Sequence, residues 1–404
     1  MLKILFVDDE EHLLQGLKRL LHGHRHRWQM SFCNSGAEAL RKLESDAYDV
    51  IVTDMRMPEV DGSRVLFESY LNSPSTLRCV LSGQSEHAQT CKVTGTAHQF
   101  LSKPTQKQDL EQVVERVEQL SVSRLTPELR LAATRLAALP VQGAVLHQLE
   151  AELKRDLPSH ELVADLIVSD VGMSAKVVQL VWSSFFGLPR KSLCPSEAVQ
   201  LLGIDMLREL VLEYGLFSPY ISDDEEPFSI EELCRHSLAV AKHAEAITYV
   251  ETQDHRASKQ AYFAGLTHDI GKLILSHQFP AMYGHALRAA REREMSLWEA
   301  ELEVFGASHA DVGSYLLALW GFPTEVIQAV AYYRTPGTCD QGGFGTATAV
   351  HVANLLNRTN HFVRTPQQQL LYGSEHLAQS GLARRTAAWC EAVKNAVAGP
   401  VLLN

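Results

Sequence analysis

Five polar residues in the first 104 positions could together handle a phosphate group. Each lies at the end of a short, mainly apolar run. Asp8 and Asp9 follow the first run, Asp54 follows the third, Ser82 follows the fourth and Lys103 follows the fifth. Carboxylates that converge repel one another and stay ionised beside a cation, and oxygen ligands with phosphate chemistry point to Mg²⁺. We expect Asp54 to be the nucleophile that becomes an acyl phosphate, with Lys103 pairing with the phosphoryl oxygens and Ser82 donating a hydrogen bond to them.

A parallel sheet would bring these residues together. Nearly all-apolar runs predict strands buried on both faces, and helix-length segments lie between them. The predicted strands are residues 3–7, 29–33, 50–53, 78–81 and 99–101, and the predicted helices are residues 11–22, 37–44, 63–71, 86–93 and 107–120. Five β-α units in a row indicate an α/β fold with a doubly wound, five-stranded parallel sheet. In such a sheet, sites form at the carboxyl ends of the strands.

Taken singly, these residues have ordinary explanations. The Asp8–Asp9 pair could cap a helix, and Lys103 with Pro104 could belong to a loop. Five such residues, each at the end of a predicted strand and in a consistent chain order, favour one shared site instead.

The first 120 residues resemble the receiver domain of bacterial two-component response regulators in the stretches ILFVDDEE, VIVTDMRMPEVDG, VLSG and FLSKP. The resemblance implies phosphorylation of Asp54 by a partner histidine kinase. It also implies that Asp9 and Asp54 are metal ligands, with Asp8 close by. The backbone carbonyl of Arg56 would be a further ligand. Phe100 matches the aromatic residue that changes rotamer on activation, although by itself it reads as a core side chain.

The rest of the chain has helical spacing and few strand signals. We interpret residues 121–134 as a linker, itself helical, and residues 135–335 as an all-α domain. Residues 336–404 are either a helical C-terminal extension or the closing part of that domain. Residues 218–229 and 335–346 are rich in turn-forming residues and are expected to be loops.

A second group of residues could bind a metal in this helical half. His268 and Asp269 are neighbours in GLTHDIGK and offer one imidazole and one carboxylate, with Lys272 close behind. Glu232 and His236 are four residues apart and would share a helix face. His309 opens a later helix and could add another ligand. The same residues could instead form a buried polar network that fixes the helices without a metal.

THDIGKL resembles the signature of the HD metal-dependent phosphohydrolase superfamily, and residues 135–335 are similar in pattern to the HDOD output domain. An active HD site would carry a further carboxylate where this chain has Asn354. HD-GYP relatives, which hydrolyse cyclic di-GMP, carry a histidine pair where this chain has Tyr332 and Tyr333. A neutral amide is a poor ligand for a hard cation. We therefore expect a degenerate, non-catalytic domain that keeps at most a single metal ion or an anion.

Composition narrows the function classes. A net charge of -11 argues against a broad surface for nucleic acid, and no helix-turn-helix with a basic face stands out. No apolar run is long enough to cross a bilayer, and the N-terminus lacks the apolar stretch of a secretory signal. The seven cysteines form no C-x-x-C pair. These features predict a cytoplasmic protein with reduced thiols.

Two functions from different classes fit these residues. The first is a response regulator that a histidine kinase phosphorylates on Asp54. Its output domain would contact an unknown downstream protein, or a second copy of the chain as a homodimer. The alternative is an enzyme: a receiver-gated, metal-dependent HD phosphohydrolase that acts on cyclic di-GMP or another nucleotide.

Overall fold

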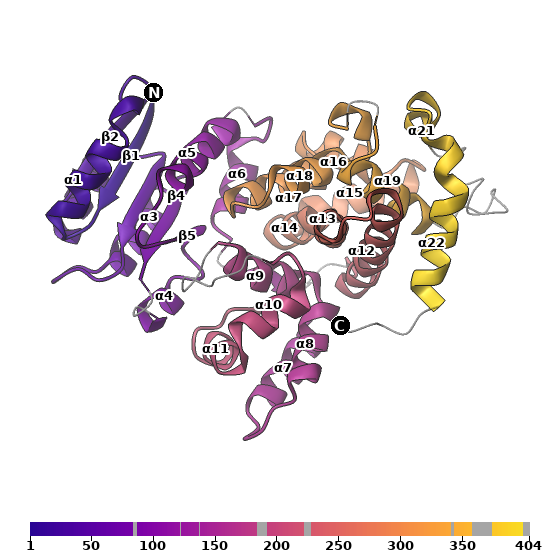
Figure 1. Cartoon of the computed structure of the whole chain (residues 1–404), viewed down its shortest axis with the longest axis horizontal. Coiled ribbons are helices and arrows are strands. Elements are labelled where there is room, and N and C mark those ends of the chain that lie inside the picture. The colour runs from indigo at the N-terminus through magenta and orange to yellow at the C-terminus, as the bar shows by residue number, and fades with distance from the viewer. Residues whose placement is uncertain are drawn as a thin grey trace.

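The computed structural model describes residues 1–83, 87–121, 123–136, 138–183, 192–221, 228–340, 343–357 and 374–398. Figure 1 shows an N-terminal α/β domain at one end of the molecule and a larger helical domain that extends to the last helices of the chain. Among the described residues, no helix combines the length and the apolar character needed to cross a membrane.

The N-terminal domain is built on one parallel sheet of five strands in the order β2-β1-β3-β4-β5. Its strands are β1 (Leu2–Val7), β2 (Trp28–Cys33), β3 (Val50–Asp54), β4 (Leu77–Ser82) and β5 (Gln99–Ser102). Its helices are α1 (Glu11–Leu20), α2 (Gly36–Ser45), α3 (Gly62–Asn72), α4 (His87–Lys92) and α5 (Lys107–Ser121). This arrangement confirms the predicted doubly wound fold, because the order of strands reverses between β1 and β3.

The apolar runs form strands because both faces of the sheet are covered. On one face, Leu5, Val7 and Ile51 pack with residues of α2 and α3. On the other face, Ile4 and Phe6 pack with residues of α1 and α5. Successive side chains of a strand point to opposite faces, so a strand covered on both sides must be apolar throughout.

The helical domain begins after α6 (Pro127–Thr134), which connects the two halves. Its helices up to residue 332 are α7 (Gly143–Leu153), α8 (His160–Ser169), α9 (Val171–Trp182), α10 (Pro195–Leu202), α11 (Ile204–Arg208), α12 (Ile230–Thr252), α13 (His255–Thr267), α14 (Ile270–Gln278), α15 (Pro280–Glu292), α16 (Leu297–Phe305), α17 (His309–Leu319) and α18 (Thr324–Tyr332). These helices confirm the predicted all-α character of this half of the chain.

Four elements of this half, two helices and two short strands, were not predicted from periodicity. Helix α14 is buried on most sides, so its sequence lacks a polar face, and α15 buries mainly small or isolated residues. A parallel pair of two-residue strands, β6 (Pro140–Val141) and β7 (Ser218–Pro219), also lies in this half. Strands of two residues are too short to show the alternation of apolar and polar residues by which a strand is predicted.

The C-terminal residues that the structure describes pack against the helical domain. Helices α19 (Thr346–Asn357) and α22 (Thr386–Ala398) both lie along α12, and Figure 1 shows α22 at the outer edge of the domain. Trp389 on α22 is fully buried, and its indole N–H donates to Glu251 Oε1 at 2.7 Å. This segment therefore extends the helical core beyond residue 335.

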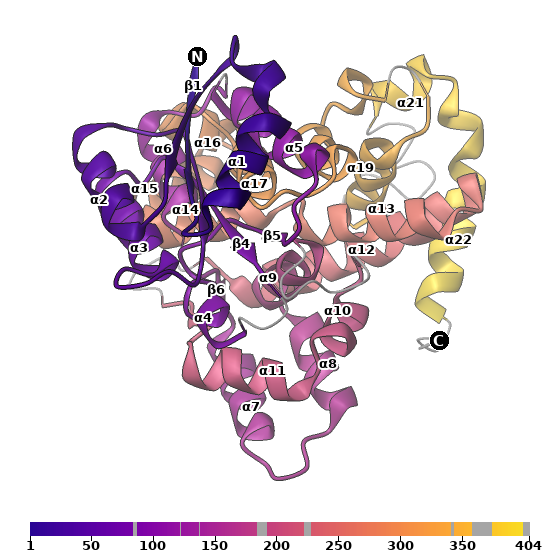
Figure 2. The same ribbon diagram turned by 60° about the vertical axis from the view of Figure 1, so that its left-hand side comes forward.

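The two domains share a continuous apolar core. One cluster of buried side chains runs from Ile4 and Phe6, through Leu129 on α6, to Phe322 in the helical domain. Helices α5 and α6 both pack on α17; α5 lies near α17 in Figure 2, and α6 lies next to α17 in Figure 1. The helical domain thus covers the β5 edge of the sheet, where unpaired backbone groups would otherwise face solvent.

Candidate functional site

Three carboxylates converge at the carboxyl end of the sheet. Asp8 and Asp9 follow β1, and Asp54 ends β3. One oxygen from each of the three lies within 4.8 Å of the others. Asp8 and Asp54 are buried and Asp9 is exposed. These residues, hereafter the acidic cluster, offer the oxygen ligands that Mg²⁺ prefers, and their mutual repulsion favours a cation among them.

Lys103 lies beside the acidic cluster, directly after β5. Its Nζ donates to Asp8 Oδ2 at 3.0 Å and forms an ion pair with Asp54 Oδ1. Burial lowers the pKa of Lys103, but the hydrogen bond and charge of Asp54, and then those of Asp8, raise it further, so the net pKa lies above its usual value. Lys103 is therefore cationic and contacts the candidate phosphoacceptor directly.

The local sequence around Asp54 fixes the carboxylate. The backbone N–H of Arg56 donates to Asp54 Oδ2 at 3.1 Å, and the Thr53 hydroxyl donates to the Asp54 carbonyl at 2.9 Å. A Cβ at Gly62 would stand 2.0 Å from that same carbonyl. Only glycine can approach so closely, so the Asp61–Gly62 step that begins α3 is a steric requirement of the site.

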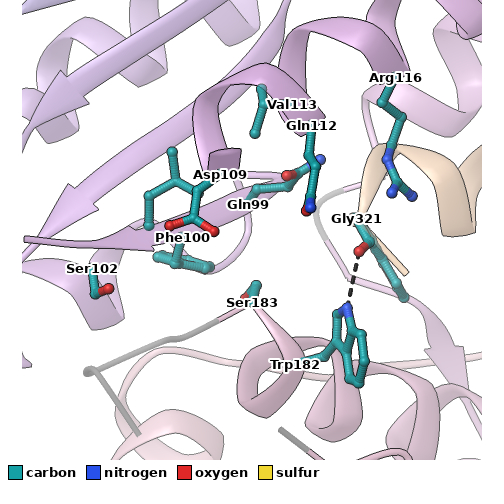
Figure 3. Close-up of a pocket in the computed structure, with 12 residues that line it drawn as sticks. Gln99, Phe100, Ser102, Asp109, Gln112, Val113, Arg116, Trp182, Ser183 and Gly321 are labelled. Atoms are coloured by element: carbon teal, nitrogen blue, oxygen red, sulfur yellow. Dashed lines mark hydrogen bonds between the residues drawn. The ribbon is translucent and has the colours of Figure 1, made fainter. Parts of the chain in front are cut away.

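The two candidate switch residues stand on neighbouring strands. Ser82 ends β4, but its side chain lies outside the described residues. Phe100 is 1% exposed on β5 and pairs with Val80 on β4. It also lines a cavity of about 50 Å³ between the two domains, together with Trp182 and Ser183 of α9 and the following turn. Figure 3 shows Phe100 and Ser183 facing each other across this cavity.

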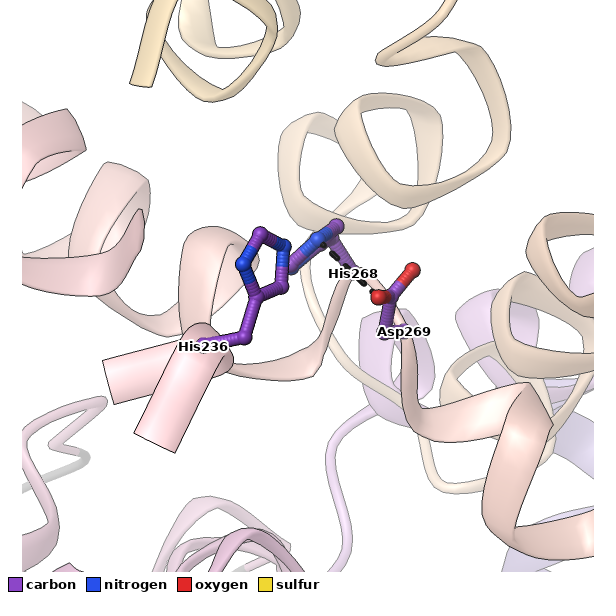
Figure 4. Close-up of side chains that lie close together, drawn as sticks. All are labelled: His236, His268 and Asp269. Carbon is purple, nitrogen blue, oxygen red and sulfur yellow. Dashed lines mark ion pairs between the residues drawn. The ribbon is translucent and has the colours of Figure 1, made fainter. Parts of the chain in front are cut away.

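A second cluster lies in the helical domain, and we call it the HD-like site. It consists of His236 on α12 with His268 and Asp269 between α13 and α14. One ligand atom from each lies within 4.8 Å of the others, and the two imidazole rings are 5.3 Å apart between centroids. Figure 4 shows the three side chains directed toward one another from two separate segments.

The tautomer of His268 leaves a nitrogen available to a ligand. Its Nδ1 lies 2.7 Å from the carbonyl of Gly265 and therefore carries the proton. Its Nε2 is buried with no hydrogen-bond partner, and the nearest carboxylate oxygen, Asp269 Oδ2, is 3.5 Å away. Burial lowers the pKa of His268 to about 4, so the ring is neutral. A neutral imidazole with a backbone-fixed Nδ1 is the usual form of a metal ligand.

His309 belongs to a polar network beside this site. Its Nδ1 lies 2.5 Å from Glu301 Oε2, and its Nε2 lies 2.9 Å from the Tyr333 hydroxyl and 3.1 Å from Asp269 Oδ1. Lys272 donates to Asp269 Oδ2 at 2.5 Å. Burial lowers the pKa of His309, but the charge of Glu301 raises it further, so the net shift is upward. Both nitrogens are therefore engaged, and His309 is not placed as a ligand.

The structure thus brings the residues that the sequence grouped together into one region but gives them different surroundings. Glu232 is exposed and lines an open pocket of about 570 Å³ that also includes His236, Asp269 and Lys272. Asn354 lies buried on α19. Sequence reasoning missed Glu301 and the hydroxyl role of Tyr333. The sequence could have indicated that Glu301 is buried, because Glu301 falls at helical spacing between the apolar residues Leu297 and Phe305 on one helix face.

Comparisons with known proteins agree with both halves of this structure. A family model for the response regulator receiver domain matches residues 4–115, and a model for the HDOD domain matches residues 139–336. An uncharacterized protein of Treponema pallidum is 25% identical over half of this chain, which spans 39% of that relative. The transcriptional regulatory protein GlrR of Escherichia coli is 30% identical over 28% of this chain, which spans 25% of that protein.

Solved structures to which this chain is similar include the MmoQ response regulator of Methylococcus capsulatus. It is 23% identical, with a TM-score of 0.47, over 65% of this chain and 98% of that one. A virulence factor of Campylobacter jejuni is 18% identical, with a TM-score of 0.48, over 68% of this chain and 98% of that one. The two family matches, at the positions where the acidic cluster and the HD-like site lie, show that this chain belongs to the two-component response regulators with an N-terminal receiver domain and a C-terminal HDOD domain.

Proposed function

We propose that a histidine kinase phosphorylates Asp54 and that the HDOD domain passes the signal to another protein without catalysing a reaction of its own. The observation that carries the first half is the geometry of the acidic cluster, where three carboxylates converge and Lys103 contacts Asp54. A carboxylate held beside a cation is suited to nucleophilic attack on phosphorus, because the cation offsets charge on the incoming group.

The transfer would proceed with a simple balance of bonds. An Asp54 carboxylate oxygen attacks the phosphorus of the donor phosphohistidine, the new O–P bond forms, and the P–N bond breaks with its electron pair going to the imidazole nitrogen. Lys103 Nζ would move from the Asp54 oxygen to a phosphoryl oxygen, since it already lies at that end of the carboxylate. The product is an acyl phosphate on Asp54.

The acidic cluster fits Mg²⁺ by its donor set. Asp8, Asp9 and Asp54 would hold the ion, together with the backbone carbonyl of Arg56. Bound there, Mg²⁺ supplies charge neutralisation for the phosphoryl oxygens.

Mass spectrometry of the intact chain tests this proposal. We expect incubation with acetyl phosphate and Mg²⁺ to add one phosphoryl group, and we expect EDTA to prevent the addition. The Asp54→Asn variant should gain nothing, whereas Asp46→Asn, at an exposed carboxylate in the loop before β3, should be modified like the native chain. Equal modification of Asp54→Asn and the native chain would exclude Asp54 as the acceptor.

The proposal of a non-catalytic output rests on the HD-like site. His309 is held by Glu301 and Tyr333. Asn354, a neutral amide, stands where an active HD site would carry a further carboxylate ligand. Hydrolysis by two metals needs both ions held a few ångströms apart. Incubating the metal-loaded chain with cyclic di-GMP and common nucleotides provides the test. Turnover that disappears in Asp269→Ala would show that the domain is an enzyme.

The buried Nε2 of His268 favours a second activity, the binding of a single metal ion. His236, His268 and Asp269 would hold it, and such a mixture of imidazole and carboxylate suits a borderline cation such as Zn²⁺ or Mn²⁺. The bound ion would supply a positive charge that ties α12 to the start of α14.

Calorimetric titration with Mn²⁺ tests the metal proposal, with His236→Ala as the variant that should lose binding. His277→Ala is the matched control, because His277 lies on α14 outside the cluster. If the native chain and His236→Ala bind Mn²⁺ equally in the presence of excess Mg²⁺, which saturates the acidic cluster, the HD-like site holds no metal.

A further inference from the structure

Helix α17 connects the HD-like site to the boundary between the domains. It begins at His309, which contacts Asp269, and it ends at Leu319 beside the receiver domain. Ser308 caps it through a reciprocal pair of hydrogen bonds with Asp311. Nearly all of its residues are buried. A capped, buried helix of this kind moves as a unit, because its side chains fill a densely packed interior.

The N-terminal end of α17 is locked to the loop that carries the HD-like site. A Cβ added at Gly271 would stand 1.9 Å from the carbonyl of His309 and 2.9 Å from the amide of Gly313. The backbones of α14 and α17 therefore touch two residues after Asp269. A displacement of α17 along its axis must shift either this contact or the hydrogen bonds of His309.

The C-terminal end of α17 is held in part by the receiver domain. We call residues 319–322 the interdomain turn. Gln99 Nε2 of β5 donates to the carbonyl of Leu319 at 2.9 Å, and Arg116 of α5 donates to the carbonyl of Phe322. Carbonyls at a helix end lack partners within the helix. Here the Leu319 carbonyl, at the end of α17, finds its partner on β5, and the Phe322 carbonyl in the following turn finds one on α5.

The turn and Gln99 fit closely. Gly321 has a φ of +78°, and a Cβ added there would lie 3.0 Å from the Gln99 side-chain amide. Trp182 Nε1 donates to the Gly321 carbonyl at 2.9 Å, the bond drawn dashed in Figure 3. The buried amide of Gln99 is thus enclosed by the backbone of the turn.

Gln99 is also placed to sense the phosphoacceptor. It precedes Phe100 on β5, and the same strand leads within four residues to Lys103, which pairs with Asp54. A new phosphoryl group would change the partners of Lys103, and the strand that directly precedes Lys103 carries the donor to α17.

We propose that Gln99 is the positioning residue that couples Asp54 to the HD-like site, acting through α17 as a rigid connector. This inference rests on the proposed phosphorylation of Asp54. By linkage, the coupling is reciprocal: the state of Asp54 alters the network around Asp269 and His309, and a change in that network alters the affinity of the receiver for a phosphoryl group.

Hydrogen–deuterium exchange on the full chain tests the forward direction, with beryllofluoride and Mg²⁺ as the phosphoryl mimic. We expect activation to change the exchange rate of amides in residues 309–322 on the order of fivefold in the native chain. Gln99→Met keeps the side-chain length but removes the donor and should abolish most of this response. Gln112→Met, on α5 at the edge of the same cavity, is the matched control and should respond like the native chain.

The coupling can also be tested in reverse, from the HD-like site to Asp54, so the inference remains testable if Gln99→Met does not fold. Tyr333→Phe removes a hydroxyl that joins His309 to Asp269 in the network beside the HD-like site. We expect it to change beryllofluoride affinity on the order of fivefold, whereas Tyr332→Phe, at the exposed neighbouring residue, should have no effect.

The outcomes separate this inference from the proposed function. If acetyl phosphate leaves the mass unchanged, phosphorylation itself is wrong. If Asp54 is modified but residues 309–322 exchange at the same rate with and without beryllofluoride, the coupling is wrong and phosphorylation stands. An equal response in the native chain and Gln99→Met would assign the coupling to another route and overturn the role of Gln99.

Discussion

Lys176, on α9 of the HDOD domain, donates a hydrogen bond of 2.7 Å to the carbonyl of Thr94 in the receiver domain. The lysine is buried, and its ammonium group lies 5.4 Å from the centre of the Trp320 ring. Among the ion pairs of the described residues, none joins Lys176 to a carboxylate. The domain interface therefore contains a buried amine without a compensating negative charge.

This arrangement predicts a stability that depends on pH. Burial lowers the pKa of Lys176 to about 7 from its usual 10.5. Above about pH 7 the unfolded chain binds one more proton here than the native chain, so this residue adds stability as pH rises, by up to about 1.4 kcal/mol per pH unit. In urea unfolding, Lys176→Met should lack this increment between about pH 7 and pH 9. Exposed Lys154→Met should follow the native profile.

The surroundings of His98 predict a loss of folding stability at acid pH. Its Nδ1 accepts from the backbone N–H of Arg78 at 3.0 Å, and its Nε2 lies 3.1 Å from the carbonyl of Thr134. Burial and then the charge of Arg78 hold the pKa of His98 well below its usual 6.5. The unfolded state then binds the extra proton first, and stability falls as pH drops below about 6.5. His98→Gln should flatten that fall in urea unfolding at several pH values, and an unchanged slope would contradict this role.

The structure of the interdomain turn predicts that two glycine-to-alanine substitutions destabilise the chain by different amounts. Gly306 and Gly321 both have positive φ, but only Gly321 has a neighbour within 4 Å of an added Cβ. Both alanine variants incur the left-handed backbone penalty of about 1–2 kcal/mol. Gly321→Ala should lose roughly 1 kcal/mol more, because it presses on Gln99. Chemical denaturation of the two variants measures the difference in the free energy of unfolding. Equal losses would mean that the Gln99 side chain moves aside without a cost in stability.

The acidic cluster predicts a competition between Lys103 and Mg²⁺. Without Lys103, the carboxylates of Asp8 and Asp54 lose their cationic partner and repel each other. Lys103→Met should therefore unfold at a lower temperature without divalent ions and should gain more from Mg²⁺ than the native chain. Thermal shift assays with and without Mg²⁺ provide the measurement. Lys107→Met, at a more exposed lysine on α5, serves as the control.

The C-terminal helix predicts a large loss of stability at one residue. Trp389 is fully buried against α12, and its indole N–H donates to Glu251. Trp389→Ala should destabilise the chain by about 3–5 kcal/mol, as expected for removing a buried aromatic side chain. Lys394→Ala on the exposed face of the same helix should change little. A small effect of Trp389→Ala in urea unfolding would show that α22 is a dispensable appendage.

The amino-acid sequence was sufficient for the fold of the first domain and for the position of its site. Apolar runs such as residues 50–53 can be recognised as strands because a strand covered on both faces must be apolar throughout. Asp54 directly follows such a run. The convergence of Asp8 and Asp54 also follows, since parallel strands end at the same edge of a sheet. Local pattern and topology determine these features together.

In the HD-like site, the sequence supplied the residues but not their partners. His268, Asp269 and His309 were recognisable from their types, but His309 could not be separated from the ligands. Its ring is held by Glu301 on α16 and by Tyr333 in the turn after α18. Contacts between side chains on different helices depend on packing angles and rotamers, which no local spacing encodes.

The junction between the domains was decided by tertiary structure alone. Gln99 reads as an ordinary strand residue, Lys176 as a helical lysine and Gly321 as a turn. Their meeting across the β5 edge depends on the orientation in which the helical domain docks onto the sheet. Hydrogen bonds from buried side chains to backbone carbonyls leave no pattern in the chain, because every residue carries a carbonyl and only the fold decides which ones lack a partner.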